Sequence, residues 1–310
     1  MSYADKLFVD ACSAVLAHGV YDTGFTVRPK WEDGTPAHTV KIIHVVQIYN
    51  LTRTSIPVMT LRKTGFKNAI DEILWIYQKK SNKVSDLHSH VWDSWTDEAG
   101  TIGKAYGYQI GQRHRHHRLD PGDVLTDITN EYPSIMVDPD GWVWMDQMDA
   151  VLWDLKYNPA SRSIMMNMYN HADLAAMGLR PCAYSISFQV VQISSGQLVL
   201  NAILNQRSQD TLTANNWNVV QYSVLLQMIA QVRGMIPGTL THVVADYHIY
   251  DRHIPFVEQL ICTYNERGGF PNPIYWQNPD VKNFYDFTLS DFELHDYQYH
   301  PFDHKIEVAV

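Results

Sequence analysis

The sequence has few of the features that mark secreted, membrane-spanning or nucleic-acid-binding proteins. Its three cysteines (Cys12, Cys182 and Cys262) are too few and too scattered for a disulfide framework, which favours a reducing compartment. No apolar run approaches the ~20 residues that a membrane span requires, and the first residues lack the basic start of a signal peptide. Positive charge is also scarce, because the net charge is −9, whereas a general nucleic-acid surface needs excess Lys and Arg. We therefore expect a cytoplasmic protein without membrane or nucleic-acid partners.

The chain does contain helix and strand patterns, and they intermingle without regular alternation. Apolar residues at helical spacing predict helices over residues 3–18, 67–80, 145–157 and 218–233. Runs rich in β-branched and aromatic residues predict strands over residues 39–51 and 239–247 and a hairpin over 184–203. Glycine and proline punctuate residues 100–111 and 114–144, which are predicted to be irregular, the second as an exposed excursion. This order favours one α+β domain over residues 1–310 rather than a doubly wound fold.

Cys182 is the first candidate for chemistry. It follows Arg180 and Pro181, where a proline-marked loop meets a predicted strand, so its thiol can be exposed and reactive. A nearby cation would favour the thiolate, the nucleophilic form of cysteine. A lone cysteine is more often a small buried hydrophobe, and that is our interpretation of Cys12 and Cys262.

Two further segments suit a nucleotide. Directly after a predicted strand come Gln206, Arg207, Ser208, Gln209 and Asp210. Arginine binds phosphate with two hydrogen bonds and serine can add a hydroxyl, although the same residues would equally suit a solvated loop. His248 and Tyr250 stand two apart on an extended segment, hence on one face, and both can hydrogen-bond a sugar hydroxyl.

Two histidine clusters could suggest a metal. The first comprises Asp246, His248, Asp251 and His253. It lacks a recognised zinc spacing and has no cysteine nearby, so we expect no metal there. The second, residues 114–118, falls in the predicted excursion and is interpreted as a solvated loop.

Two polar residues border predicted helices. Glu72 lies beside the apolar face of its helix, where a carboxyl group is either a poised acid or base or a boundary residue that faces water. Asn218 begins the longest predicted helix, so it is either an N-cap or an amide that binds the edge of a heterocycle.

In order and spacing, these residues resemble the thymidylate synthase family over nearly the whole chain. The matching motifs are Asn158-Pro159-Ala160-Ser161-Arg162, Pro181-Cys182, Gln206-Arg207-Ser208-Gln209-Asp210, Asn218 and Asp246-Tyr247-His248-Ile249-Tyr250. Upstream matches are Glu72-Ile73-Leu74-Trp75, Trp92-Asp93-Ser94-Trp95 and Ala105-Tyr106-Gly107. The ending Glu307-Val308-Ala309-Val310 resembles the family's mobile C-terminal segment, and Asp33-Gly34-Thr35-Pro36-Ala37-His38-Thr39 is similar to a bacterial and phage branch.

The resemblance implies a single α+β domain with a large mixed sheet and flanking helices, paired sheet to sheet in a homodimer. It implies reductive methylation of dUMP to dTMP with 5,10-methylenetetrahydrofolate, through an adduct between Cys182 and pyrimidine C6, and release of dihydrofolate. Asparagine at position 218 indicates uracil, because Asp there would suit the amino group of cytosine.

The resemblance also implies residue roles. The catalytic group is expected to be Cys182, Glu72, Tyr106, Asn218 and Arg207. The dUMP-binding residues are expected to be Arg28, Gln206, Arg207, Ser208, Asp210, Asn218, His248 and Tyr250, with Arg162 supplied across the dimer interface. The folate-binding residues are expected to be Trp92, Trp95, Asp210 and Val310.

The chain departs from the usual family pattern at three places. Ala183 follows the nucleophile where His is common, Ser163 replaces a second arginine, and residues 215–217 replace Leu-Pro-Phe. Two other functions share these features. A nucleotide hydroxymethylase would let water capture the methylene, and a silent relative would only bind nucleotide; Trp92 favours methylation, because it matches the ring that lines the methylene in methylating enzymes.

Overall fold

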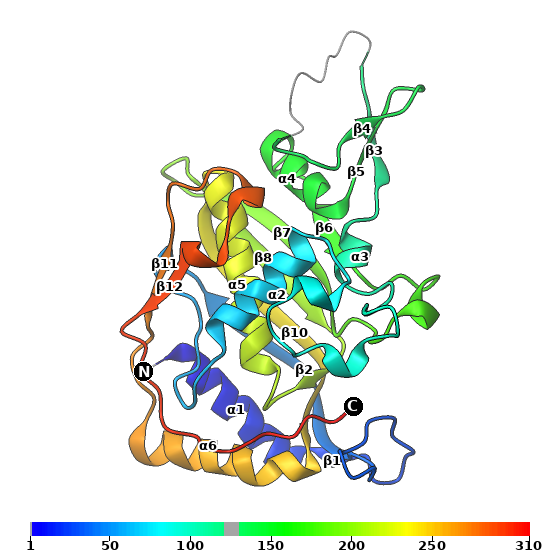
Figure 1. The fold of residues 1–310 in the computed structure, drawn as a ribbon. Helices are drawn as coiled ribbons and strands as arrows, with labels where there is room; N and C mark the ends of the chain where they lie inside the picture. Colours follow the sequence, from blue (N-terminus) through cyan, green and yellow to red (C-terminus); the bar gives the residue numbers. More distant parts are fainter. Residues whose placement is uncertain (1, 121–129) are drawn as a thin grey trace.

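The computed structural model describes residues 2–120 and 130–310 and mixes helices with strands, as the sequence predicts (Figure 1). The helices are α1 (Tyr3–His18), α2 (Phe66–Tyr77), α3 (Gly107–Ile110), α4 (Gln147–Tyr157), α5 (Asn215–Val232) and α6 (Ile254–Arg267). The strands are β1 (Val20–Tyr21), β2 (Thr39–Asn50), β3 (His114–Arg118), β4 (Met136–Val137), β5 (Trp142–Met145), β6 (Met165–Asn167), β7 (Ala183–Gln192), β8 (Leu198–Gln206), β9 (Gln209–Asp210), β10 (Ile236–Tyr250), β11 (Ile274–Gln277) and β12 (Phe292–His295). Within the described chain, no helix combines the length and hydrophobicity that crossing a membrane requires.

The main sheet has the order β1-β2-β10-β8-β7-β6, and β9 pairs with β10. β10 is antiparallel to β2 but parallel to β8, so the sheet is mixed. β7 and β8 form the predicted hairpin. It turns at Gly196, whose φ of 82° lies in the left-handed region that glycine adopts without strain. The predicted α+β class with a large mixed sheet is confirmed.

The two faces of this sheet differ. On one face α5 packs on β8 and β10 while α1 packs on β2 and β10 (Figure 1). Leu240 and its register partner Tyr49 point to this core and are buried. The next position, Thr241, pairs with Ile48 and Ile203. These two side chains point to the other face, where they are 50% and 39% exposed.

The prediction that residues 114–144 are irregular is wrong for their described part. Residues 114–118 form β3, which pairs with β5, and β5 pairs with β4, so the segment is a small antiparallel sheet that extends from the main body (Figure 1). The Asp140-Gly141 signal marks the turn of a hairpin: Asp138 Oδ1 accepts hydrogen bonds from the N–H groups of Asp140 and Trp142. The Pro121-Gly122 signal lies outside the described residues.

Two smaller expectations also need correction. The long helix begins at Asn215 rather than at residue 218, and the N–H of Asn218 donates to the Ala214 carbonyl, so Asn218 lies inside the first turn and is not the N-cap. The segment 100–111, predicted to be irregular, ends in the one-turn helix α3. Gly107 is required there because a Cβ would lie 2.2 Å from the Ser81 carbonyl oxygen.

Candidate active site

Cys182 lies immediately before β7 in a pocket of about 300 Å³. Side chains from α2, α5, residues 91–106 and the C-terminal tail line this pocket together with the thiol. The other two cysteines lie elsewhere: Cys12 is buried, as expected, whereas Cys262 is exposed on α6, which corrects its interpretation as a buried hydrophobe.

Arg207 holds the loop that presents Cys182. Its Nε donates to the Pro181 carbonyl at 3.0 Å and its Nη2 to the Arg180 carbonyl at 2.7 Å. The same Nη2 lies 3.7 Å from Cys182 Sγ. Burial raises the pKa of the Cys182 thiol, while the Arg207 and Arg28 guanidinium groups lower it without cancelling that effect. Cationic activation therefore acts in the predicted direction, but the thiol of the free protein stays protonated at neutral pH.

Glu72 of α2 lies in the same pocket and is 6% exposed. Its Oε1 accepts a hydrogen bond from Trp92 Nε1 at 3.1 Å, and its Oε2 accepts one from Trp217 Nε1 at 2.7 Å. Burial raises the pKa of Glu72 to about 6, against the opposite effect of the two indole donors. A carboxyl group with a pKa this close to neutrality can both take up and release a proton.

Tyr106 connects the two ends of this pocket. Its hydroxyl accepts a hydrogen bond from the Cys182 N–H at 3.1 Å, and its ring lies edge-on to Trp92. Its φ of 46° is rare for a non-glycine residue. Burial raises the pKa of Tyr106 well above its ordinary value, so the phenol remains protonated.

The Asn218 amide faces the pocket from α5 and is fixed on both sides. Its Oδ1 accepts from Gln206 Nε2 at 3.2 Å, and its Nδ2 donates to Gln221 Oε1 at 3.0 Å. Gln206 is itself oriented by His242, whose Nε2 lies 2.8 Å from Gln206 Oε1. One N–H and one lone pair of the Asn218 amide remain for a heterocycle.

Asp210 is the last residue of β9 and precedes the turn into α5. It accepts hydrogen bonds from the Leu212 and Thr213 N–H groups and from the Thr213 hydroxyl. His253 Nδ1 lies 3.8 Å from its Oδ1. Burial raises the pKa of Asp210, but His253 and His248 lower it by more than burial raises it. The pKa is therefore below its ordinary value, and the group stays ionised.

His248 and Tyr250 lie side by side on β10, as the sequence predicts. Their rings meet edge to face at 5.1 Å. His248 Nδ1 lies 2.8 Å from Asp246 Oδ1, while its buried Nε2 has no hydrogen-bond partner among the described residues. Arg28 is exposed, and it lowers the pKa of both Cys182 and Tyr250, which places its charge near this group.

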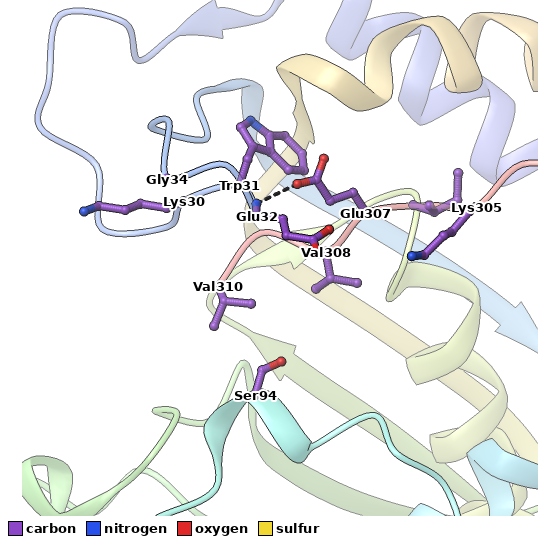
Figure 2. Close-up of a pocket in the computed structure, with 10 residues that line it drawn as sticks. Lys30, Trp31, Glu32, Gly34, Ser94, Lys305, Glu307, Val308 and Val310 are labelled. Atoms are coloured by element: carbon purple, nitrogen blue, oxygen red, sulfur yellow. Dashed lines mark hydrogen bonds between the residues drawn. The ribbon is translucent and has the colours of Figure 1, made fainter.

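The C-terminal tail closes one side of the site. The Val310 and Lys30 backbones exchange two hydrogen bonds, and the Glu32 N–H donates to Glu307 Oε1 at 2.6 Å (Figure 2). A second cavity of about 670 Å³ lies between this tail, residues 30–34 and Ser94. Val308 lines both cavities, whereas Val310 lines only the second among these two.

Comparisons with known proteins decide the family. The thymidylate synthase family model matches residues 6–310. The chain belongs to the thymidylate synthase family. It is 37% identical to thymidylate synthase 1 of Bacillus spizizenii (strain W23) and 38% identical to thymidylate synthase 1 of Bacillus subtilis (strain 168), each over 296 residues and 94% of both chains. A thymidylate synthase of Bacillus phage phi3T is 37% identical over the same share. The solved structure of thermostable thymidylate synthase A from Bacillus subtilis has a TM-score of 0.82 and 37% identity over 99% of both chains.

Of the residues that the resemblance to thymidylate synthases singled out, six line the Cys182 pocket: Glu72, Trp92, Trp95, Tyr106, Cys182 and Asn218. Arg207 lies against the thiol, and the others lie outside this lining. Arg162 is exposed on the loop before β6 and does not line the Cys182 pocket. Val310 lines the neighbouring cavity instead. Ser208 lies beside Arg207 and accepts a hydrogen bond from Gln206 through its carbonyl. The described residues contain no group of three or more His, Cys, Asp or Glu side chains placed to hold a metal ion.

Sequence reasoning did not assign several residues that line this thymidylate synthase pocket, among them Trp217, Gln221 and Tyr222 of α5 and Val308 of the tail. The three on α5 follow from helical spacing around Asn218, since residues 217, 218, 221 and 222 lie on neighbouring positions of one face. Val308 and Val310 alternate along an extended tail, and only the structure shows which of them faces the thiol.

Proposed function

We propose that this protein catalyses the reductive methylation of dUMP to dTMP. The observation that carries the proposal is the placement of Cys182, with Arg207 Nη2 3.7 Å from its sulfur, in one pocket with the buried Glu72. Family membership supports the same reaction.

Cys182 is the nucleophile. Its sulfur adds to C6 of the uracil ring, and the electron pair of the C5–C6 double bond makes C5 nucleophilic, which divides one difficult step into easier ones. Because burial keeps the thiol protonated in the free protein, its proton passes to water before the bond to C6 forms, and Arg207 stabilises the thiolate that adds.

Glu72 manages proton transfer. Its pKa of about 6 allows it to give or take a proton near neutral pH. The protonated Tyr106 hydroxyl lies at the Cys182 backbone and can relay a proton between water and the C5 side of the ring.

The nucleotide is held by residues on both sides of the thiol. Arg207, Ser208 and Arg28 bind the phosphate, and Arg162 of a second copy of this chain adds a further guanidinium. Asn218, oriented by Gln206, binds O4 and N3 of uracil with the free half of its amide. His248 and Tyr250 bind the deoxyribose hydroxyl, for which the unpartnered His248 Nε2 is available.

The residues beside the nucleotide site fit a folate. Trp95 Nε1 is buried without a hydrogen-bond partner among the described residues, and the Trp92 and Trp95 rings offer flat surfaces to a heterocycle. Trp92, Trp95, Asp210 and Val310 would hold 5,10-methylenetetrahydrofolate, joined by Val308. When bound, the folate supplies the one-carbon unit and the hydride and leaves as dihydrofolate.

The proposed active form is a homodimer. Ile48 and Ile203 lie in one register row on the face of the main sheet that α1 and α5 do not cover, and a second copy packed sheet to sheet would bury them. This arrangement would bring Arg162 to the partner's phosphate site. We also propose that residues 1–310 form one domain, supported by a single family match over residues 6–310, and that the protein is cytoplasmic.

The test is to mix the purified protein with dUMP and 5,10-methylenetetrahydrofolate, follow dihydrofolate by absorbance and identify the nucleotide by mass. Formation of dTMP together with dihydrofolate is the expected result. Hydroxymethyl-dUMP without dihydrofolate would assign the protein as a hydroxymethylase, and dUMP binding without any product would make it a silent relative.

A further inference from the structure

The Glu72 carboxyl is held by two indole groups from different parts of the chain. Trp92 approaches Oε1 from the segment before the short helix at Asp93–Trp95, and Trp217 approaches Oε2 from the first turn of α5. The two distances are 3.1 and 2.7 Å, so the Trp217 bond is the shorter.

The Trp217 ring also lies close to the backbone just before the helix that carries Glu72. Gly65 is the residue before α2, and a Cβ added there would lie 2.9 Å from Cζ3 of Trp217. The φ of Gly65 is −73°, so it is the contact with the indole, and not a left-handed backbone, that favours glycine here.

From this geometry we infer that Trp217 is a positioning residue for Glu72: with Trp92 it occupies both carboxyl oxygens, fixes the plane of the group and favours its ionised form. A hydrogen bond to the charged form of an acid lowers the free energy of that form alone. The inference concerns the carboxyl group itself, and its catalytic meaning rests on the proposed function.

The other titratable groups around Glu72 do not replace this effect. Asp71, next to it on α2, opposes ionisation. Tyr106 and Tyr222 face it from residues 91–106 and from α5, and burial raises the pKa of both phenols, so they stay neutral. Cys182 lines the same pocket, and burial raises the pKa of its thiol. The described residues lining this pocket include no lysine or arginine, so neutral donors are what favour the carboxylate.

The test is a direct titration of Glu72 by carbon-13 NMR in substrate-free protein labelled at glutamate carboxyl carbons, with the signal assigned by its loss in Glu72→Gln. We expect Trp217→Phe to raise the pKa of Glu72 by about one unit, a tenfold change in the ionisation constant. Benzothienylalanine at position 217 keeps the ring shape without the N–H and should give the same shift. Gly65→Ala, which displaces the indole, should shift it in the same direction by less.

Trp95→Phe is the matched control. Its indole borders the same pocket but has no hydrogen-bond partner among the described residues, so its loss should leave the pKa of Glu72 in place. An unchanged pKa of Glu72 in Trp217→Phe would overturn the inference. An unchanged pKa of Glu72 with benzothienylalanine at position 217 would overturn it too, because the loss of packing would then explain the result with phenylalanine. The titration needs no substrate, so a failure to form dTMP would count against the proposed function alone.

In active protein, the plot of kcat against pH should show an inflection due to Glu72, which Glu72→Gln removes. Variants that shift the pKa of Glu72 should shift this inflection too. The expected shift is about one pH unit upward for Trp217→Phe and none for Trp95→Phe, whatever either does to the rate itself. An inflection that stays in place while the NMR titration moves would overturn the catalytic part of the inference.

Discussion

Glu72 is a buried carboxyl group near Cys182 and Asp210 a partly buried one, yet their pKa values shift in opposite directions. Burial raises the pKa of Glu72 to about 6 because its partners, Trp92 and Trp217, are neutral donors. Burial also acts on Asp210, but the neighbouring imidazoles reverse its effect and hold the pKa below the ordinary value. Neutral hydrogen bonds offset only part of the rise in pKa that burial causes, whereas the attraction of a nearby cation lowers the pKa by more than burial raises it.

The difference separates two tasks within one site. The region of Glu72 is aromatic and holds a group that exchanges protons near neutral pH. The region of Asp210 holds a permanent negative charge, which accepts the N–H groups of Leu212 and Thr213 and so fixes the chain between β9 and α5. Pairs of acids with environments that differ in this way are typical of enzyme sites.

The largest effect is expected where both regions act, at the thiol. Cys182→Ser should lower turnover by about 10⁴-fold or more, the size of loss seen when a covalent nucleophile is removed. Binding of dUMP should change little, because the arginines and Asn218 remain. Product formation by mass and dUMP affinity by calorimetry measure the two quantities. Turnover near that of the unchanged protein would contradict the covalent mechanism.

Glu72→Gln tests the proton-exchanging role of Glu72. We expect kcat to fall by about 10²–10⁴-fold, the usual contribution of a general acid–base group. The inflection of kcat near pH 6 should disappear with it. Asp210→Asn is the counterpart: it should lower activity by loss of a fixed charge while keeping that inflection. If the inflection survived Glu72→Gln or vanished in Asp210→Asn, the assignment of tasks would be reversed.

Asn218→Asp adds a third carboxyl group to the site. The new side chain can still accept from Gln206 Nε2, but it loses both amide N–H groups: the one that Asn218 donates to Gln221 and the one that it would offer to uracil O4. A mismatched hydrogen bond costs about 1–3 kcal/mol, so the ratio of kcat/KM for dUMP to that for dCMP should fall roughly 10- to 100-fold. Asn218→Ala should also lower this ratio, because it weakens dUMP without adding an acceptor for the amino group of cytosine. An unchanged ratio in Asn218→Asp would mean that the amide does not select the base.

Sequence patterns predicted the elements of the main body because those elements follow local rules. Helical periodicity located α1, and a run of β-branched residues located β2. The excursion was misjudged because β3 is made of His and Arg, which have no strand signature, and it becomes a strand only by pairing with the hydrophobic β5. Strand formation that depends on a distant partner is poorly visible in local sequence.

The site shows the same limit. Cys182, Arg207 and Asn218 stand in recognisable motifs, so the resemblance found them. The hydrogen bond between Trp217 and Glu72 joins residues 145 positions apart, and the contact of His253 with Asp210 crosses from β9 to the start of α6. Neither pairing leaves a spacing in the sequence, and each alters a pKa that composition alone cannot give.

The smallest effect concerns stability and tests the Asp210 side of the comparison. Asp210 has a lowered pKa, so it contributes stability above its unfolded value of about 3.9, and this is lost as pH falls. Burial lowers the pKa of His253, but Asp210 raises it more, so His253 contributes stability below about 6.5 that is lost as pH rises through its folded pKa. Both contributions are therefore present together between about pH 4 and 6.5.

His253→Gln should therefore lower the free energy of unfolding by about 1–2 kcal/mol near pH 5.5, and by less at pH 8, measured by urea denaturation. His242→Gln is the matched comparison, because burial lowers the pKa of His242 to about 3 without a carboxylate partner. Because His242 stays neutral in the folded protein, it lowers the free energy of unfolding as pH falls below about 6.5. The free energy of unfolding of His242→Gln, relative to that of the unchanged protein, should therefore be higher at pH 5.5 than at pH 8. Parallel pH dependences in the two variants would show that the Asp210 region does not rely on a cation.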